Sequence, residues 1–210
     1  HYWANKVLTD GVTAADLTVN EPALIGWLHT LEAISQLCMA SARYRAAADY
    51  ARRVLKAEGY PTRAAGTVLL ALARLEDQDG FFALAHQLEE QVGADALENS
   101  PWYLLARTIL LFKTNKMRPA VRALREFANR CEGGAFFLLN PMYQTPYLPC
   151  RPEPRDPWDL SHQAVWEADG IISRLCPLGQ CLRRRVAACP GICAPLRFLV
   201  THSTRPCRLR

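Results

Sequence analysis

The densest group of side chains that could perform acid–base chemistry lies in the segment SHQAVWEADG, residues 161–170. His162, Glu167 and Asp169 place one base and two carboxylic acids within eight residues. General acid–base catalysis requires side chains that converge on one reacting group. On a helix, His162 shares a face with Trp166 at the i, i+4 spacing, whereas Glu167 lies on another side. We therefore expect no catalytic residues and no enzyme here, and predict a solvated helix with one or two caps.

The cysteines near the C-terminus could hold a metal ion. Structural zinc sites usually use two close pairs of ligands, about two to four residues apart. The gaps here are four, seven, three and thirteen residues, and arginines and Pro190 interrupt the pairs. We assign no metal site and no cofactor, and keep zinc binding as an alternative. The residues concerned are Cys176, Cys181, Cys189, Cys193 and Cys207, with His202 nearby.

The charge of the chain is divided unevenly. The formal net charge is +5, but residues 177–210 contain seven arginines, no lysine and no acidic residue. Removing these seven from the 25 basic residues leaves 18 against 20 acidic ones, a net charge of −2 for residues 1–176. A nucleic-acid-binding domain is expected to carry a basic face on its folded part. We therefore expect residues 176–210 to be a disordered basic tail. The alternatives are binding of nucleic acid or of an anionic membrane surface through it, and a shifted reading frame over residues 177–210.

Other sequence features indicate the cellular compartment of the protein. The longest apolar run covers six residues, 68–73, which is too short to span a bilayer. No basic region followed by an apolar stretch marks a signal peptide. Cys38, Cys131 and Cys150 are scattered through the body, as is typical of the reduced thiols of a cytosolic protein. We predict a cytoplasmic protein that does not bind membranes.

The elements that position these residues are predicted to be helices. Between residues 22 and 130, apolar residues recur at three- and four-residue spacing, Ala and Leu dominate, and β-branched runs are lacking. Because the connections are short, consecutive helices must pack as antiparallel hairpins. The fold class is therefore all-α. The breaks that separate six helices fall at residues 42–44, 59–61, 77–80, 93–100, 113–117 and 133–134.

The three predicted hairpins resemble one another. The first helix of each carries an apolar stripe at offsets 0, +3, +4 and +7, where a neighbouring helix can pack. The stripes are Leu31, Ile34, Ser35 and Cys38, then Val68, Ala71, Leu72 and Leu75, then Trp102, Leu105, Ala106 and Ile109. The second helices carry Tyr44, Ala47, Ala51 and Val54, then Phe81, Leu84 and Leu88, then Ala120, Leu124 and Phe127. We expect these residues to form the core.

This pattern resembles the tetratricopeptide-repeat family over residues 28–130. The chain departs from the family at Leu72, where a small residue is expected, and in a period near 37 residues between the first two hairpins and 34 between the next. The resemblance implies an α–α superhelix of about three antiparallel hairpins. The residues that match best are Trp102, Leu105, Ala106, Tyr44, Ala47 and Pro61.

We predict one helical-repeat domain over residues 1–175. Within it, prolines interrupt residues 133–157, although the aromatic and aliphatic content there is too high for a free linker. This segment is expected to be a loop or extended strap against the array, with a polyproline-type ligand as an alternative. Residues 158–175 return to a helical pattern and predict a helix that closes the array.

The resemblance implies a scaffold that binds a partner protein or peptide, and no small-molecule substrate is evident from the sequence. In such arrays the first helices line a concave groove that grips an extended segment or a helix. An accessory module of a larger regulator or enzyme is a second interpretation, which the start at His1 supports. A third is metal or nucleic-acid binding through the tail. The expected partner-binding residues are His29, Glu32, Gln36, Met39, Leu69, Ala73, Glu76, Tyr103 and Arg107.

Overall fold

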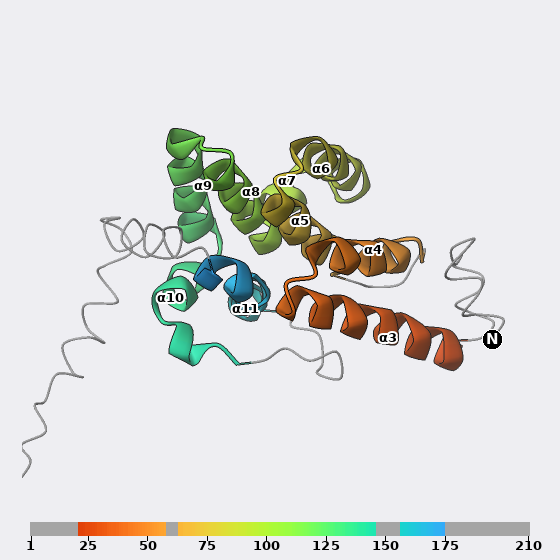
Figure 1. Cartoon of the computed structure of the whole chain (residues 1–210). Helices are drawn as coiled ribbons and strands as arrows, with labels where there is room; N and C mark the ends of the chain where they lie inside the picture. Colours follow the sequence, from red (N-terminus) through yellow and green to blue (C-terminus); the bar gives the residue numbers. More distant parts are fainter. Residues whose placement is uncertain (1–20, 58–62, 146–155, 175–210) are drawn as a thin grey trace, which may run out of the picture.

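The computed structural model describes residues 21–57, 63–145 and 156–174. All elements that these ranges contain are helical, which confirms the predicted all-α fold (Figure 1). They are α3 (Glu21–Ala40), α4 (Tyr44–Leu55), α5 (Ala64–Leu75), α6 (Gln78–Val92), α7 (Ala94–Glu98), α8 (Pro101–Lys113), α9 (Met117–Arg130), α10 (Gly134–Leu139), the 3-10 turn η1 (Pro141–Tyr143) and α11 (Pro157–Arg174). None of the helices in these ranges is long and apolar enough to cross a membrane.

The six helices predicted between residues 22 and 130 are present and pair in sequence. The extensive contacts run from α3 to α4, from α4 to α5, from α5 to α8 and from α8 to α9. The first helices of the three hairpins are α3, α5 and α8, and the second helices are α4, α6 and α9. In α6 only Phe81 and Ala85 are buried, so this helix is the least enclosed of the six.

The three hairpins share one backbone turn. Each first helix is followed by a residue in the left-handed region, namely Ala42, Glu76 and Asn115, with φ of 61°, 64° and 59°. In each case the next N–H donates to a carbonyl five residues earlier, at 2.8, 3.1 and 2.8 Å. This is the pairing of a Schellman motif, which normally places glycine at the left-handed position. The recurrence of the same turn at corresponding positions supports the repeat seen in the sequence.

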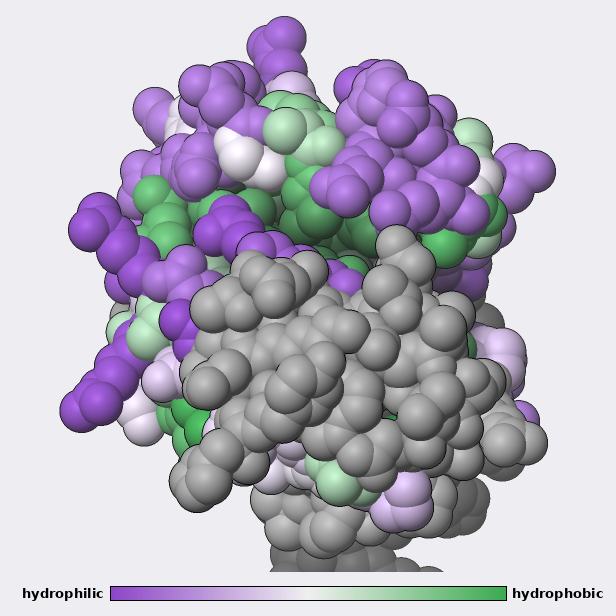
Figure 2. Space-filling view, turned by 90° about the vertical axis from the view of Figure 1, so that its right-hand side faces the viewer, coloured by the Kyte–Doolittle hydropathy of each residue, from purple (hydrophilic) through white to green (hydrophobic). Residues whose placement is uncertain are grey.

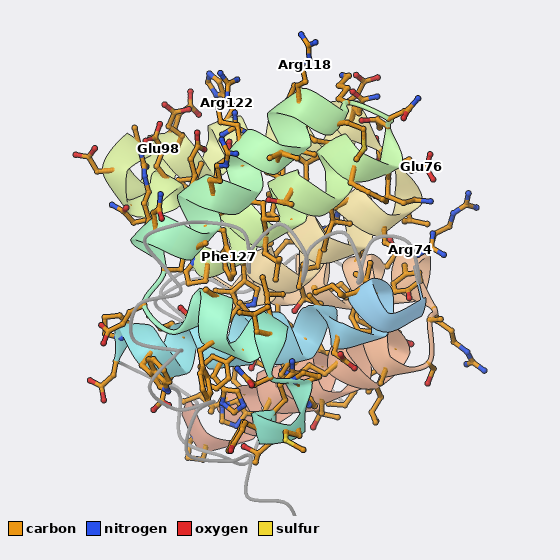
Figure 3. All side chains as sticks on the ribbon, turned by 90° about the vertical axis from the view of Figure 1, so that its left-hand side faces the viewer. Arg74, Glu76, Glu98, Arg118, Arg122 and Phe127 are labelled. Atoms are coloured by element: carbon orange, nitrogen blue, oxygen red, sulfur yellow. The ribbon has the colours of Figure 1, made fainter. Side chains whose placement is uncertain are left out.

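The predicted stripes form the core, with a few residues at its edge. On α4 the residues Tyr44, Ala47, Ala51 and Val54 are all buried. Phe127 of α9 points inward, whereas Arg118 and Arg122 of the same helix project outward (Figure 3). A helix that is apolar along one side and charged along the other packs its apolar side against the core and leaves the charged side in solvent. Leu75, in the last turn of α5, is 36% exposed.

The outer surface near α6 is mostly hydrophilic. Figure 2 shows charged and polar side chains projecting from the upper part of this face, with apolar surface set between them. Leu75 of α5 and Phe82 of α6 are among the large apolar side chains that remain exposed. Single exposed apolar residues are common on soluble domains and require no special function.

Two segments predicted to be irregular contain helix. The break at residues 93–100 holds α7, in which Leu97 is buried. The prediction of a loop or extended strap is wrong for residues 134–139, which form α10. Gly133, with a positive φ of 75° that glycine adopts without strain, precedes this helix, and Phe137 and Leu138 within it are buried. Of this segment, α10 packs against α9 and α11, and residues 146–155 lie outside the described ranges.

The predicted closing helix is present as α11. It packs against the three first helices and against α10 (Figure 1). The prediction that residues 161–170 form a solvated helix is wrong, since Ser161, His162 and Gln163 are buried together with its apolar residues. Because α11 has neighbours on two sides, even its polar positions lose contact with water. The predictions for Pro61, Cys150, Leu175 and the tail, residues 176–210, fall outside the described ranges.

Candidate functional site

The contact between α11 and the helical array is centred on the side chains of Trp102 and Glu167. The indole Nε1–H of Trp102 donates to Glu167 Oε2 at 2.8 Å, across 65 residues of sequence. Gln163 Nε2 donates to Glu167 Oε1, also at 2.8 Å. Both oxygens of the carboxylate therefore accept a hydrogen bond, which reduces the cost of placing it between helices.

Trp102 is itself held by residues around the start of α5. The Arg63 guanidinium lies 5.5 Å from the centre of the Trp102 ring, within the range of a cation–π contact. Gly66 faces the same ring so closely that a Cβ atom there would lie 2.3 Å from Trp102 Cδ1. A side chain at position 66 would push the indole away, so glycine allows α5 and α8 to approach. Trp102 thus links α5, α8 and α11.

The pKa of the Glu167 carboxyl is raised above its ordinary value. Burial raises the pKa of this carboxyl to about 7 from 4.5, and the nearby Glu32 raises it further. The hydrogen bonds from Trp102 and Gln163 and the charge of Arg63 act in the opposite direction. Loss of hydration outweighs these favourable contacts, because a charged carboxylate is penalised strongly in a low-dielectric site. At neutral pH the protonated and ionised forms are therefore both populated.

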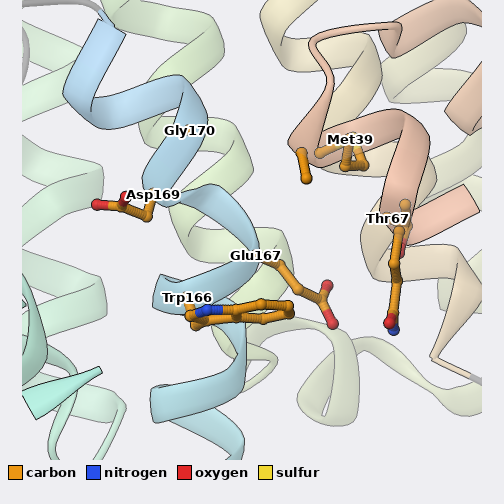
Figure 4. A pocket seen from close by; sticks show the side chains of 8 residues that line it. Met39, Thr67, Trp166, Glu167, Asp169 and Gly170 are labelled. Carbon is orange, nitrogen blue, oxygen red and sulfur yellow. The ribbon is translucent and has the colours of Figure 1, made fainter. Parts of the chain in front are cut away.

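A cavity of about 230 Å³ lies beside this carboxyl, where α3, α5 and α11 meet. Figure 4 shows Trp166 and Glu167 side by side on α11, with Met39 and Thr67 on the opposite wall. Asp169 points away from Glu167. Met39 and Trp166 form apolar walls of the cavity, and most of the other lining side chains are polar. The lining residues are Gln36, Met39, Ala40, Thr67, Trp166, Glu167, Asp169 and Gly170.

The partner-binding residues predicted on α3 lie on one side of that helix. His29, Glu32, Gln36 and Met39 follow at spacings of three and four, which places them in a row. Gln36 and Met39 line the cavity. His29 is exposed, Glu32 and Gln36 are partly buried, and Met39 is buried. The row therefore runs from solvent into the cavity.

The other predicted partner-binding residues do not line this cavity. Leu69 and Ala73 are buried within the array. Glu76 occupies the turn after α5 and pairs with Lys113. Tyr103 and Arg107 are partly buried on α8, where Tyr103 stacks on Phe81 with ring centres 6.0 Å apart and Arg107 pairs with Glu126 at 3.6 Å. The structure thus brings together only the α3 part of the predicted groove.

His162 and Glu167 occupy different environments. His162 Nε2 accepts the backbone N–H of Thr145 at 3.0 Å, and its ring packs on Phe137 with centres 4.6 Å apart. Glu167 instead faces Trp102 and the cavity. This arrangement agrees with the expectation that His162 and Glu167 lie on different sides of the helix and do not face one common atom. An acid–base pair would need both side chains on one substrate atom.

Residues 21–57, 63–145 and 156–174 contain no cluster of three or more His, Cys, Asp or Glu side chains that could hold a metal ion. Cys38 and Cys131 are free thiols. Burial raises the pKa of the Cys131 thiol to about 12, with Arg130 acting weakly in the other direction. A thiol held in its protonated form is a poor nucleophile and a poor metal ligand.

The pairing of Trp102 with Glu167 was missed by the sequence reasoning, which treated Trp102 as core and Glu167 as solvated surface. One signal could have pointed to it. Glu167 lies three residues after Ala164 and four before Ile171, both of which are buried. It therefore interrupts an apolar stripe, and a carboxylate in such a stripe requires a hydrogen-bond donor on the facing helix. No sequence signal identifies Trp102 as that donor.

Comparison of the chain with protein-family models, with curated proteins and with solved structures returned no match.

Proposed function

We propose that this chain is a protein-interaction scaffold built on a tetratricopeptide-like array, and that it binds a segment of a partner protein along α3. The observation that carries the proposal is the position of α11. This helix packs on α3, α5 and α8, the three first helices of the hairpins. Their common face therefore accepts a helix as a ligand, here one from the same chain, which is the helix-in-groove mode of recognition.

The partner segment is proposed to lie on the part of this face that α11 leaves open. The row of His29, Glu32 and Gln36 leads along α3 to the cavity beside Glu167. It combines exposed polar groups at one end with a recessed site at the other. Recognition sites commonly combine a recessed anchor point with a polar, solvated approach.

Binding rather than catalysis is proposed for this site. The two side chains suited to acid–base chemistry in α11 have separate partners, Thr145 for His162 and Trp102 for Glu167. Neither is arranged with the other around a common reacting atom. The cavity also has a volume of about 230 Å³, below the range of about 300 to 1,000 Å³ typical of small-molecule pockets.

Site-specific photo-cross-linking tests this proposal. A photoreactive amino acid at position 36 should yield a discrete cross-linked product with a partner in cells of the native organism. The matched control carries the same group at Ala83, an exposed position on α6. Products of the same kind and yield from both positions would contradict a binding site along α3. The double variant Tyr103→Ala, Arg107→Ala then reports whether the contact extends to α8.

A further inference from the structure

The cavity at the junction of α3, α5 and α11 is lined by apolar and polar groups that suit one kind of side chain. Its walls combine the thioether of Met39 with the aromatic ring of Trp166. The Glu167 carboxyl extends from α11 toward the wall that holds Thr67 (Figure 4), and Gln36 and Thr67 add polar groups. An aliphatic stem would fit between the apolar walls, and a polar head would meet the carboxyl.

The charges around the cavity favour a cation. Glu167 and Asp169 are in its lining, and Glu32 of α3 is close enough to raise the pKa of Glu167. Arg63, before α5, is the positive group that acts on Glu167 in the other direction. Trp102, from α8, does not titrate, and the segment of α10, GAFFLL, contains no titratable side chain. When Glu167 is ionised, its carboxylate is a negative group in the lining of the cavity, and it attracts a cation.

We propose that this cavity is an anchor site for one arginine side chain of the partner, with the guanidinium on the Glu167 carboxylate and beside the Trp166 ring. The inference rests on the proposed function, because it supplies the chemistry of the partner segment. Arginine fits better than lysine, since its planar guanidinium both stacks on an aromatic ring and donates two parallel hydrogen bonds to a carboxylate. The cavity volume of about 230 Å³ suits a single side chain.

The arginine site implies a link between binding and pH. A guanidinium binds the ionised form of Glu167, so binding releases a proton whenever the carboxyl is protonated beforehand. With a pKa of about 7 for Glu167, the ionised fraction, and with it the affinity, rises about tenfold from pH 6 to pH 8. The variant Glu167→Gln should lose this pH dependence together with the affinity.

The test is a titration of the full-length, isotope-labelled protein, followed by nuclear magnetic resonance at the Gly170 amide and the Trp166 indole. The probe is N-acetyl-arginine N-methylamide, and the controls are the neutral citrulline and the lysine analogues. We expect saturable shifts with the arginine probe and at least about tenfold weaker binding of the citrulline analogue. Equal binding of citrulline would overturn the cation site, and equal binding of lysine would overturn the choice of arginine.

A second variant keeps the test independent of the Glu167 network. Gly170 lines the cavity, and a Cβ atom there would meet no atom within 4 Å outside its own stretch of helix, so Gly170→Leu adds a side chain at the lining without a steric clash. The matched control is Gly26→Leu on α3, where a Cβ atom is also unobstructed. Gly170→Leu should abolish binding of the arginine probe while Gly26→Leu retains it. Unchanged binding in both variants would overturn the site.

The two proposals fail in different ways. A partner cross-linked at position 36 combined with no arginine binding leaves the scaffold function standing and refutes the arginine anchor. Specific arginine binding without any cross-linked partner supports the anchor site and refutes the scaffold function along α3.

Discussion

Replacing Glu167 by glutamine should change how the stability of the protein depends on pH. In the native protein the carboxyl has a pKa raised to about 7 from 4.5. A group with a raised pKa in the folded state contributes stability that is fully present below the unfolded pKa and is lost as the pH rises through the folded pKa. The ionisation of Glu167 therefore lowers the free energy of unfolding progressively between pH 4.5 and about 7. Above that range the reduction stays constant.

The size of this cost follows from the shift. A rise of the pKa from 4.5 to about 7 corresponds to about 3 kcal/mol. Glu167 keeps some contact with solvent in the cavity, and screening by this solvent reduces the expected cost to about 2 kcal/mol. The lost stability should appear mainly in the docking of α11, because the carboxyl lies between this helix and Trp102.

Glutamine at position 167 can satisfy the same neighbours without a charge. Its side-chain oxygen can accept the Trp102 N–H, as Glu167 Oε2 does now. Its amide nitrogen then takes the place of Glu167 Oε1, which now accepts from Gln163 Nε2. A 180° turn of the Gln163 amide brings Gln163 Oε1, which has no hydrogen-bond partner in the described structure, into position to accept from it. The variant should therefore fold, and should be more stable than the native protein at pH 8 by about 2 kcal/mol.

Urea-induced unfolding of the full-length protein between pH 5 and pH 8 provides the assay. The informative quantity is the difference in unfolding free energy between Glu167→Gln and the native protein, because other titrating groups cancel in it. This difference should increase by about 1.5 kcal/mol from pH 5 to pH 8, because pH 5 lies above the unfolded pKa and part of the cost is already present there. The control Glu89→Gln removes a carboxylate from an exposed position on α6. A Glu167→Gln difference that is the same at both pH values would refute the reasoning.

Three further outcomes follow from the packing. Gly66→Ala should destabilise the fold by about 1 to 3 kcal/mol in urea unfolding, since the added methyl group overlaps the Trp102 ring; unchanged stability would contradict the close contact. Ala42→Gly should stabilise it by about 1 kcal/mol, because φ is 61° there, whereas the control Ala83→Gly, inside α6, should destabilise it by about the same amount. Cys131 should resist alkylation in peptide mapping of the native protein, because its thiol is buried and its pKa is raised to about 12; alkylation as fast as in urea would exclude this burial.

The helical array could be predicted from the sequence because its determinants are local. The stripe of Tyr44, Ala47, Ala51 and Val54 has helical spacing, and all four residues are buried as this spacing indicates. The breaks between helices also follow from local residues, such as Asp77, whose carboxylate accepts the Gly80 N–H at 2.9 Å at the start of α6.

The site could be predicted only in part, because it depends on contacts between distant residues. Gln36 and Met39 were assigned to a partner-binding groove by the resemblance to the tetratricopeptide-repeat family, and both line the cavity. That Glu167 would bond to Trp102 depends on how α11 crosses α8, and periodicity within one helix does not determine the position of a helix on its neighbours. The helix α10 was missed for a different reason. It is only six residues long, and the prolines that follow it led to the prediction of an irregular segment.

The most direct measurement of the central claim is the mapping of the cross-link formed from position 36. A photoreactive group there should label one segment of a partner protein, and mass spectrometry should locate the label close to an arginine. A leucine side chain added at the cavity lining by Gly170→Leu should abolish this product, while Gly26→Leu should leave it intact. A product that survives Gly170→Leu, or that forms equally from position 83, would contradict binding of a partner at the junction of α3, α5 and α11.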